Sequence, residues 1–219
     1  MSILSWFNKP KWQSNNEQVR LTAVQHGTDP ELMAHLSELV FHDSSIKVQK
    51  AALNRINELS VLQNVAAKHP INDLQQLAEK RLSHLLAAVT AEQQTDTHLT
   101  IAQQLKSNET KAHLIEHGQA LPLRQAAVEG LTRQGLLGDL LLSVQSLDLQ
   151  QHILANINQT STLKRVQAQL GNKNNALKKA IAQKLQQQDP IDPQHAARDL
   201  CQQLEQVVLK NQRLDLKQV

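Results

Sequence analysis

The chain repeats one pattern of apolar and polar positions, which is clearest in residues 43–56. Polar residues that suit a helix N-cap come first there, and apolar residues follow at Val48, Ala51, Ala52 and Ile56. Because these positions are spaced 0, +3, +4 and +8, they lie in one stripe along a single face of an α-helix. The pattern therefore predicts an amphipathic helix that buries this stripe.

The same stripe recurs along the chain at nearly even intervals. The copies begin at Val19, Val48, Leu74, Leu99, Leu123, Leu149 and Leu177. Successive starts differ by 29, 26, 25, 24, 26 and 28 residues, and the copies at Val19 and Leu99 fit the offsets least well. A regular interval of this kind indicates a repeat protein.

A second, shorter apolar stripe precedes most of the clear copies, and residues typical of turns, such as Asp29-Pro30 and His69-Pro70, separate the stripes. The unit is therefore a helix, a turn, a second helix and a turn. Since one hairpin cannot bury its own apolar face, neighbouring hairpins are expected to stack. Small alanines in the second helix favour close approach between helices. We predict an all-α fold, an α-α superhelix (solenoid) of short HEAT-like helical hairpins.

Composition also favours helices over sheets. Aromatic residues make up 2% of the chain and tyrosine is absent, whereas β-sandwiches and barrels draw on aromatic and β-branched residues. A single cysteine, Cys201, excludes an intramolecular disulfide and a cysteine-rich zinc site. No apolar run is long enough to span a bilayer and no secretory signal pattern is present. We therefore expect a cytoplasmic protein that does not associate with a membrane.

Three regions are expected along the chain. Residues 1–13 hold Trp6, Phe7 and Trp12, and are predicted to form an aromatic cap on the first repeat, with a membrane or partner anchor as the alternative. Residues 14–188 form the repeat array, in which the irregular segment 87–98 marks a division. Residues 189–219 contain Pro190 and Pro193 and are predicted to form a linker and a trailing helix.

The chain resembles the N-terminal HEAT-like repeat region of long bacterial proteins that carry the domain of unknown function 349. The resemblance lies in the opening Trp6-Phe7-Asn8-Lys9-Pro10-Lys11-Trp12-Gln13 and the following Val19-Arg20-Leu21-Thr22-Ala23-Val24. The later segment Asp199-Leu200-Cys201-Gln202-Gln203-Leu204-Glu205 is similar to the point where a coiled-coil-rich region starts in that family. The resemblance implies a repeat segment cut from a larger protein, and it brings no catalytic residues with it.

The sharpest chemical motif is His113-Leu114-Ile115-Glu116-His117, which has the His-x-x-Glu-His order of inverted zinc peptidases. That chemistry needs a third ligand and an open cleft, but Gly118 follows at once and no recognisable ligand helix comes later. Phosphate loops and nucleophile elbows are also absent from the sequence. We therefore predict no catalytic residue, no cofactor and no metal site.

Residues 149–188 carry six basic residues and no acidic residue. These candidate polyanion-binding residues are Lys164, Arg165, Lys173, Lys178, Lys179 and Lys184. The leading hypothesis is a non-enzymatic scaffold that presents a surface to another protein or to the C-terminal remainder of its own chain. The alternative is a module that binds the nucleic-acid backbone through this basic block, provided that its charges converge on one face. The block could equally be a solvated face or a seat for an acidic segment.

Overall fold

A computed structural model describes residues 9–171 and 174–188. These residues form twelve α-helices and one 3-10 turn, and the described part of the chain contains no strand, so the all-α prediction is confirmed. The chain divides into two compact units, residues 1–157 and 158–219, which are described separately. Trp6 and Phe7 of the predicted cap, Lys173, and the predicted linker and trailing helix at 189–219 lie outside the described residues.

The first unit contains the 3-10 turn and ten helices within the described residues. Their bounds are η2 (Lys11–Gln13), α1 (Glu17–His26), α2 (Pro30–His42), α3 (Ile46–Leu53), α4 (Leu59–Lys68), α5 (Asn72–Ala87), α6 (Asp96–Gln104), α7 (Asn108–His117), α8 (Leu121–Glu129), α9 (Gln134–Ser143) and α10 (Leu147–Asn156). The described part of the second unit contains two helices, α11 (Thr160–Leu170) and α12 (Asn175–Gln188), which pack against each other.

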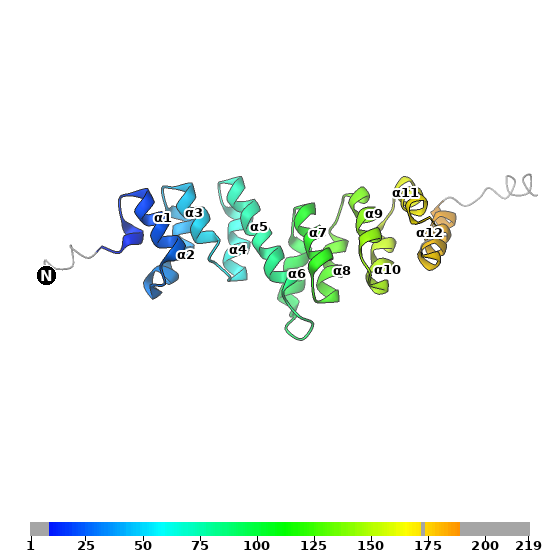
Figure 1. The fold of residues 1–219 in the computed structure, drawn as a ribbon, viewed down its shortest axis with the longest axis horizontal. Coiled ribbons are helices and arrows are strands. Elements are labelled where there is room, and N and C mark those ends of the chain that lie inside the picture. The colour runs from blue at the N-terminus through cyan, green and yellow to red at the C-terminus, as the bar shows by residue number, and fades with distance from the viewer. Residues whose placement is uncertain (1–8, 172–173, 189–219) are drawn as a thin grey trace, which may run out of the picture. The chain divides into compact units, whose positions relative to one another are not determined.

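Helices of the first unit stack in two series (Figure 1). In the first series α1 contacts α3, α3 contacts α5, α5 contacts α7 and α7 contacts α9, and in the second α6 contacts α8 and α8 contacts α10. Within hairpins, α2 packs on α3, α4 on α5, α7 on α8 and α9 on α10. Contact between every second helix is the packing expected of stacked hairpins.

The predicted stripes form the interior of this packing. The first residue of the copies at Val48, Leu74, Leu123 and Leu149 is completely buried in each case. The alanines of these four stripes are also fully or almost fully buried, including Ala52, Ala78 and Ala127. A methyl group at these positions lets neighbouring helices approach closely, as the sequence predicted.

Helix α6 interrupts the order of the hairpins. Before it, the second helix of each hairpin (α3, α5) belongs to the first series; after it, the first helix of each hairpin (α7, α9) takes that place. Only the connecting residues 88–95 separate α5 from α6, so the copy expected at Leu99 lacks a first helix. In α6 the buried residues are Ile101 and Ala102, while Leu99 is half-buried. This different stripe explains why the copy at Leu99 fitted poorly.

A polar residue follows the first residue of most stripes and holds the preceding turn. Gln49 Nε2 donates to the Asp43 carbonyl at 2.7 Å, Gln75 Nε2 to that of His69 at 2.6 Å, and Gln150 Nε2 to that of Val144 at 2.7 Å. Each hydrogen bond reaches back six residues. In the copy at Leu99 the corresponding residue is Thr100, which bonds to the Asp96 carbonyl within its own helix.

The Gln75→Ala substitution is expected to lower the free energy of unfolding by about 1 kcal/mol, because the His69 carbonyl loses its side-chain donor. Urea denaturation followed by circular dichroism measures the change. The matched control is Gln76→Ala on the exposed side of the same helix turn, which we expect to be close to neutral. Equal losses in the two variants would contradict a role for the Gln75 hydrogen bond.

Arg20 and Asp43 join α1 to the turn between α2 and α3. Arg20 Nε lies 2.8 Å from Asp43 Oδ2 and Nη2 lies 3.0 Å from Oδ1, in a two-pronged ion pair. Arg20 Nη1 also donates to the Ser14 carbonyl at 2.8 Å, so it too reaches back six residues. The hydrogen bond to Asp43 raises the pKa of Arg20. Asp43, which the sequence marked only as a possible cap, thus fixes the first helix of the stack.

Candidate binding groove between α5 and α7

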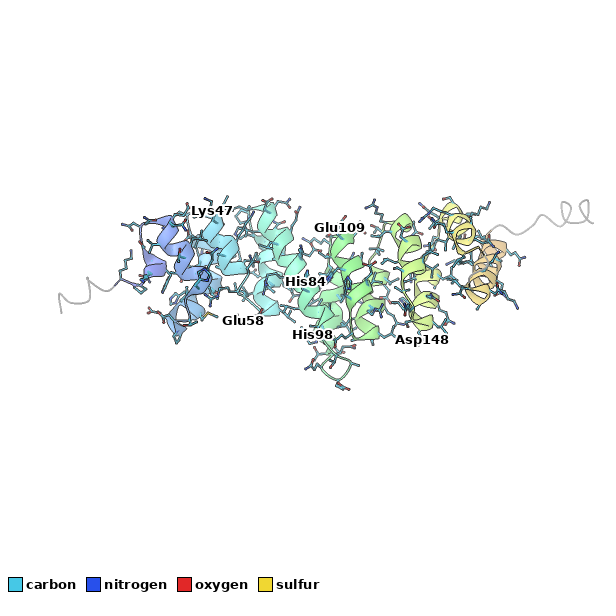
Figure 2. All side chains as sticks on the ribbon, viewed as in Figure 1. Lys47, Glu58, His84, His98, Glu109 and Asp148 are labelled. Carbon is cyan, nitrogen blue, oxygen red and sulfur yellow. The ribbon has the colours of Figure 1, made fainter. Side chains whose placement is uncertain are left out.

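A groove of about 670 Å³ lies between α5 and α7 in the first unit. All of its lining residues carry polar side chains, although apolar atoms supply most of the exposed lining surface. The lining residues are Gln76, Lys80, Ser83 and His84 from α5, and Ser107, Glu109, Thr110 and His113 from α7 and its N-cap. Figure 2 labels His84 on one side of this groove and Glu109 on the other. The groove lies where α7 packs on α5, and α6 lies between these two helices in the sequence.

A buried carboxylate forms the base of the contact between the two helices. Glu79 of α5 is 9% exposed, and its Oε1 accepts from the backbone N–H of Lys106, from that of Ser107 at 2.6 Å and from the Thr110 hydroxyl at 3.1 Å. These donors belong to the first turn of α7 and the residues just before it. A carboxylate at a helix N-terminus is stabilised by the unpaired N–H groups and by the helix dipole.

Two further buried polar side chains join α7 to its neighbours, Ser83 from α5 and Lys111 toward the C-cap of α8. Ser83 is 1% exposed, and its hydroxyl donates to the Thr110 carbonyl at 2.7 Å. Lys111 is 6% exposed and its Nζ donates to the Gly130 carbonyl. Burial lowers the pKa of Lys111, whereas the negative charge of Glu79 acts in the opposite direction. The helix contact is therefore held by hydrogen bonds between groups that water barely reaches.

Three histidine rings run along the groove and beyond it. The ring centroids of His84 and His113 are 4.2 Å apart, and those of His113 and His117 are 4.8 Å apart. The Nδ1 of His113 lies 3.1 Å from the Ser83 hydroxyl. Because that hydroxyl gives its hydrogen to the Thr110 carbonyl, Nδ1 is assigned as the protonated nitrogen. Burial chiefly, and then the charges of His84 and His117, lower the pKa of His113.

The Ser83–His113 contact has the residue types of a catalytic dyad but not its geometry. A nucleophilic serine must donate its hydrogen to the histidine and must reach a substrate. Ser83 is 1% exposed and its hydrogen is used on the Thr110 carbonyl. The structure therefore assigns this contact to the helix interface.

The zinc-peptidase motif is likewise accounted for by packing. His113 and His117 lie on one side of α7, as their spacing requires, and His84 comes from α5. The three rings pack against one another, with neighbouring centroids 4.2 and 4.8 Å apart. Within residues 9–171 and 174–188, no group of three histidine, cysteine or carboxylate side chains is placed to hold a metal ion.

Acid is expected to weaken the fold through His113. The folded state lowers the pKa of His113 below its ordinary value of 6.5, so the unfolded chain takes up the proton first as the pH falls. This contribution to stability is complete above pH 6.5 and is lost as the pH falls from there to the folded-state pKa. Urea denaturation at pH 7.5 and 5.5 should show a smaller acid-induced loss for His113→Gln than for wild type. Equal losses in His113→Gln and wild type would contradict this role. The control is His26→Gln, which changes an exposed histidine of α1.

The predicted basic block lies in the second unit. Lys164 and Lys179 are exposed, whereas Arg165, Lys178 and Lys184 are half-buried. At about 100° per residue, Lys178, Lys179 and Lys184 point in directions at least about 100° apart around α12. Lys178 Nζ donates to the Gly171 carbonyl at 3.0 Å, the same role that Gln75 has in its own turn. Burial lowers the pKa of Lys184. The structure therefore does not bring these cations together on one face of α12.

Comparison with known proteins gives no relative. No family model matches the chain, and neither a curated protein nor a solved structure matches it. Among the helices of the described residues, none combines the length and apolarity needed to cross a lipid bilayer.

Proposed function

We propose that this chain is a non-enzymatic helical-repeat scaffold, and that the groove between α5 and α7 binds an extended segment of protein. The segment belongs to another protein or to a later part of the same polypeptide, as the resemblance to proteins with the domain of unknown function 349 suggests. A cytoplasmic location is part of this proposal and accords with the single cysteine.

The observation that carries the proposal is the contrast between the base of the groove and its rim. At the base, the buried Ser83 donates to the Thr110 carbonyl at 2.7 Å, and the Thr110 hydroxyl donates to Glu79 at 3.1 Å, so these groups are already used within the helix contact. On the rim, Gln76, Lys80 and His84 are exposed and offer an amide, an ammonium and an imidazole along one helix. A rigid base with exposed polar groups above it suits recognition of a peptide backbone and its side chains, with little movement of the helices.

Capture experiments with matched surface variants test the scaffold. The immobilised chain should retain a specific protein from extracts of its source cells, and fluorescence anisotropy with that purified protein should give the affinity. The groove variant Lys80→Glu/His84→Ala should weaken binding at least about tenfold. The control Lys68→Glu/His42→Ala changes the same residue types at exposed positions of α4 and α2 and should bind normally. Equal affinity of the two variants would place the binding site elsewhere.

Nucleic-acid binding through the basic block is the alternative, and it has its own test. Anisotropy with short duplex DNA and RNA, at low and at physiological salt, should compare wild type with Lys164→Glu/Arg165→Glu/Lys179→Glu. Lys178 is left intact because its ammonium holds the Gly171 carbonyl. Tight, salt-dependent binding that the variant loses would overturn the scaffold proposal in favour of a polyanion module. We expect no such binding, since the charges on α12 diverge.

A further inference from the structure

The stripe of α1 is uncovered, although the same stripe is buried in the clear copies. Val19 begins this copy and is 39% exposed, whereas Val48 and Leu74, at the same position of later copies, are fully buried. Thr22 is exposed and Ala23 is half-buried, while their counterparts Ala51 and Ala52 are buried. The opposite side of α1 is packed normally on α3, where Val24 is fully buried. The α1 stripe therefore faces a space that a neighbour fills in the other copies.

That space is a defined groove between η2, α1 and α2, with a volume of about 670 Å³. The lining residues are Pro10, Lys11, Trp12, Gln18, Val19, Thr22, Ala23, His26, Gly27, Asp29 and Leu32. No atom can be added at Gly27, because a Cβ there would lie 2.5 Å from the Ala23 carbonyl oxygen and 2.8 Å from Leu32 Cδ2. The backbone therefore forms a close-packed wall.

Trp12 contributes a second sign that the groove receives something. Its side chain is 6% exposed and packs against His35, with ring centroids 4.9 Å apart. Its indole Nε1 is buried and has no hydrogen-bond partner among the described residues. A buried indole N–H normally finds an acceptor, so Trp12, which lines the groove, holds one unmatched donor.

We propose that the aromatic side chains of Trp6 and Phe7 occupy this groove and cover the α1 stripe. Both residues lie outside the described part of the chain, which begins at Lys9, and Pro10 and Lys11 already line the groove. Phe7 is three residues before Pro10 and Trp6 is four, so about 10–14 Å of chain is available to reach Val19. The occupant is thus tethered at the mouth of its site, which makes its effective concentration high.

The composition of the opening residues matches the groove. Met1, Ile3 and Leu4 precede Trp6 and Phe7, so five of the first seven residues are large and apolar. Large apolar side chains that pack on Val19 and Ala23 would remove apolar surface of both partners from water. The occupancy is independent of the α5–α7 groove and of the partner proposed for it.

Site-specific photo-cross-linking of the full chain tests the occupant. Phe7 is replaced by p-benzoylphenylalanine, which keeps a large aromatic side chain, and cross-links are mapped by mass spectrometry. We expect intramolecular cross-links to the α1 stripe, chiefly Val19, Thr22 and Ala23. Cross-links between two copies would overturn the proposal in favour of a dimer contact. Cross-linking only to added phosphatidylcholine–phosphatidylglycerol vesicles would overturn it in favour of a membrane anchor, and intramolecular cross-links confined to other helices would exclude the groove.

Hydrogen exchange provides a second measurement that does not need the photoreactive residue. In Trp6→Ser/Phe7→Ser, the amides of α1 should exchange at least about tenfold faster than in wild type, while those of α8 should not change. The same effect is expected from Thr22→Arg, which places a charge in the groove at an exposed position. Asn8→Ser and Gln25→Arg are the controls, since neither changes an apolar group or a residue that lines the groove. Unchanged α1 exchange in both test variants would overturn the proposal.

Discussion

Replacing Glu79 by alanine is expected to lower the free energy of unfolding by about 3 kcal/mol. The substitution leaves the N–H groups of Lys106 and Ser107 and the Thr110 hydroxyl without their acceptor. It also removes the negative charge that favours the buried ammonium of Lys111. Urea denaturation followed by circular dichroism measures the loss, and hydrogen exchange should locate it at the start of α7.

Two controls separate the hydrogen bonds of Glu79 from the simple loss of a carboxylate. Glu79→Gln keeps an acceptor oxygen and should cost less than the alanine variant. Glu58→Ala removes an exposed carboxylate at the N-cap of α4, where the side chain makes no capping hydrogen bond, and should cost less than about 0.5 kcal/mol. A Glu79→Ala variant as stable as Glu58→Ala would show that the carboxylate does not hold α5 and α7 together.

The second large effect is expected at the C-terminal end of α5. Leu86 is fully buried in the last turn of this 16-residue helix, whereas the other helices of its series have 8 or 10 residues. Leu86→Ala should lower the free energy of unfolding by about 3 kcal/mol, through lost burial and the cavity that remains. The neighbouring Leu85 is half-buried, so Leu85→Ala should cost clearly less under the same denaturation assay. A cost below about 1 kcal/mol for Leu86→Ala would contradict a core contact of the last turn of α5.

The helices and much of their core follow from local periodicity. Apolar residues at offsets of three and four lie on one face of a helix, and stacking buries that face. The first residues of four stripes are therefore fully buried: Val48, Leu74, Leu123 and Leu149. The sequence marked the segment 87–98 as irregular, but periodicity could not predict that the helices after it change series. The spacing of apolar residues in a stripe is the same for helices of either series. Which series a helix joins depends on the connection at residues 88–95 and on the length of α5.

The sequence predicted only some of the residues at the contact between α5 and α7. His113 and His117 drew attention as a zinc motif, but Glu79, Ser83 and Thr110 did not. One local signal existed, since Glu79 and Ser83 each follow a buried stripe residue and lie four positions apart on one side of α5. Their partners lie 27 to 31 residues away on α7, and no local pattern fixes that pairing.

The basic block illustrates a related limit. Counting charges along the sequence located the basic block. Whether its side chains form one positive surface depends on their directions around each helix, and these directions depend on which side of the helix is buried. On α12 the burial of Leu177 and Ile181 places Lys178 and Lys184 at opposite borders of the buried side and turns Lys179 to solvent.

The single helix α6 also constrains how such a chain can change in length. Adding or removing a whole hairpin changes the chain by two helices, so the helices that follow it in the first unit stay in the same series. Adding or removing one helix before α7 reverses this order and moves each of α7–α10 to the other series of the first unit. Insertions and deletions in pairs of helices should therefore leave binding surfaces beyond the change intact, whereas loss of α6 alone should exchange them.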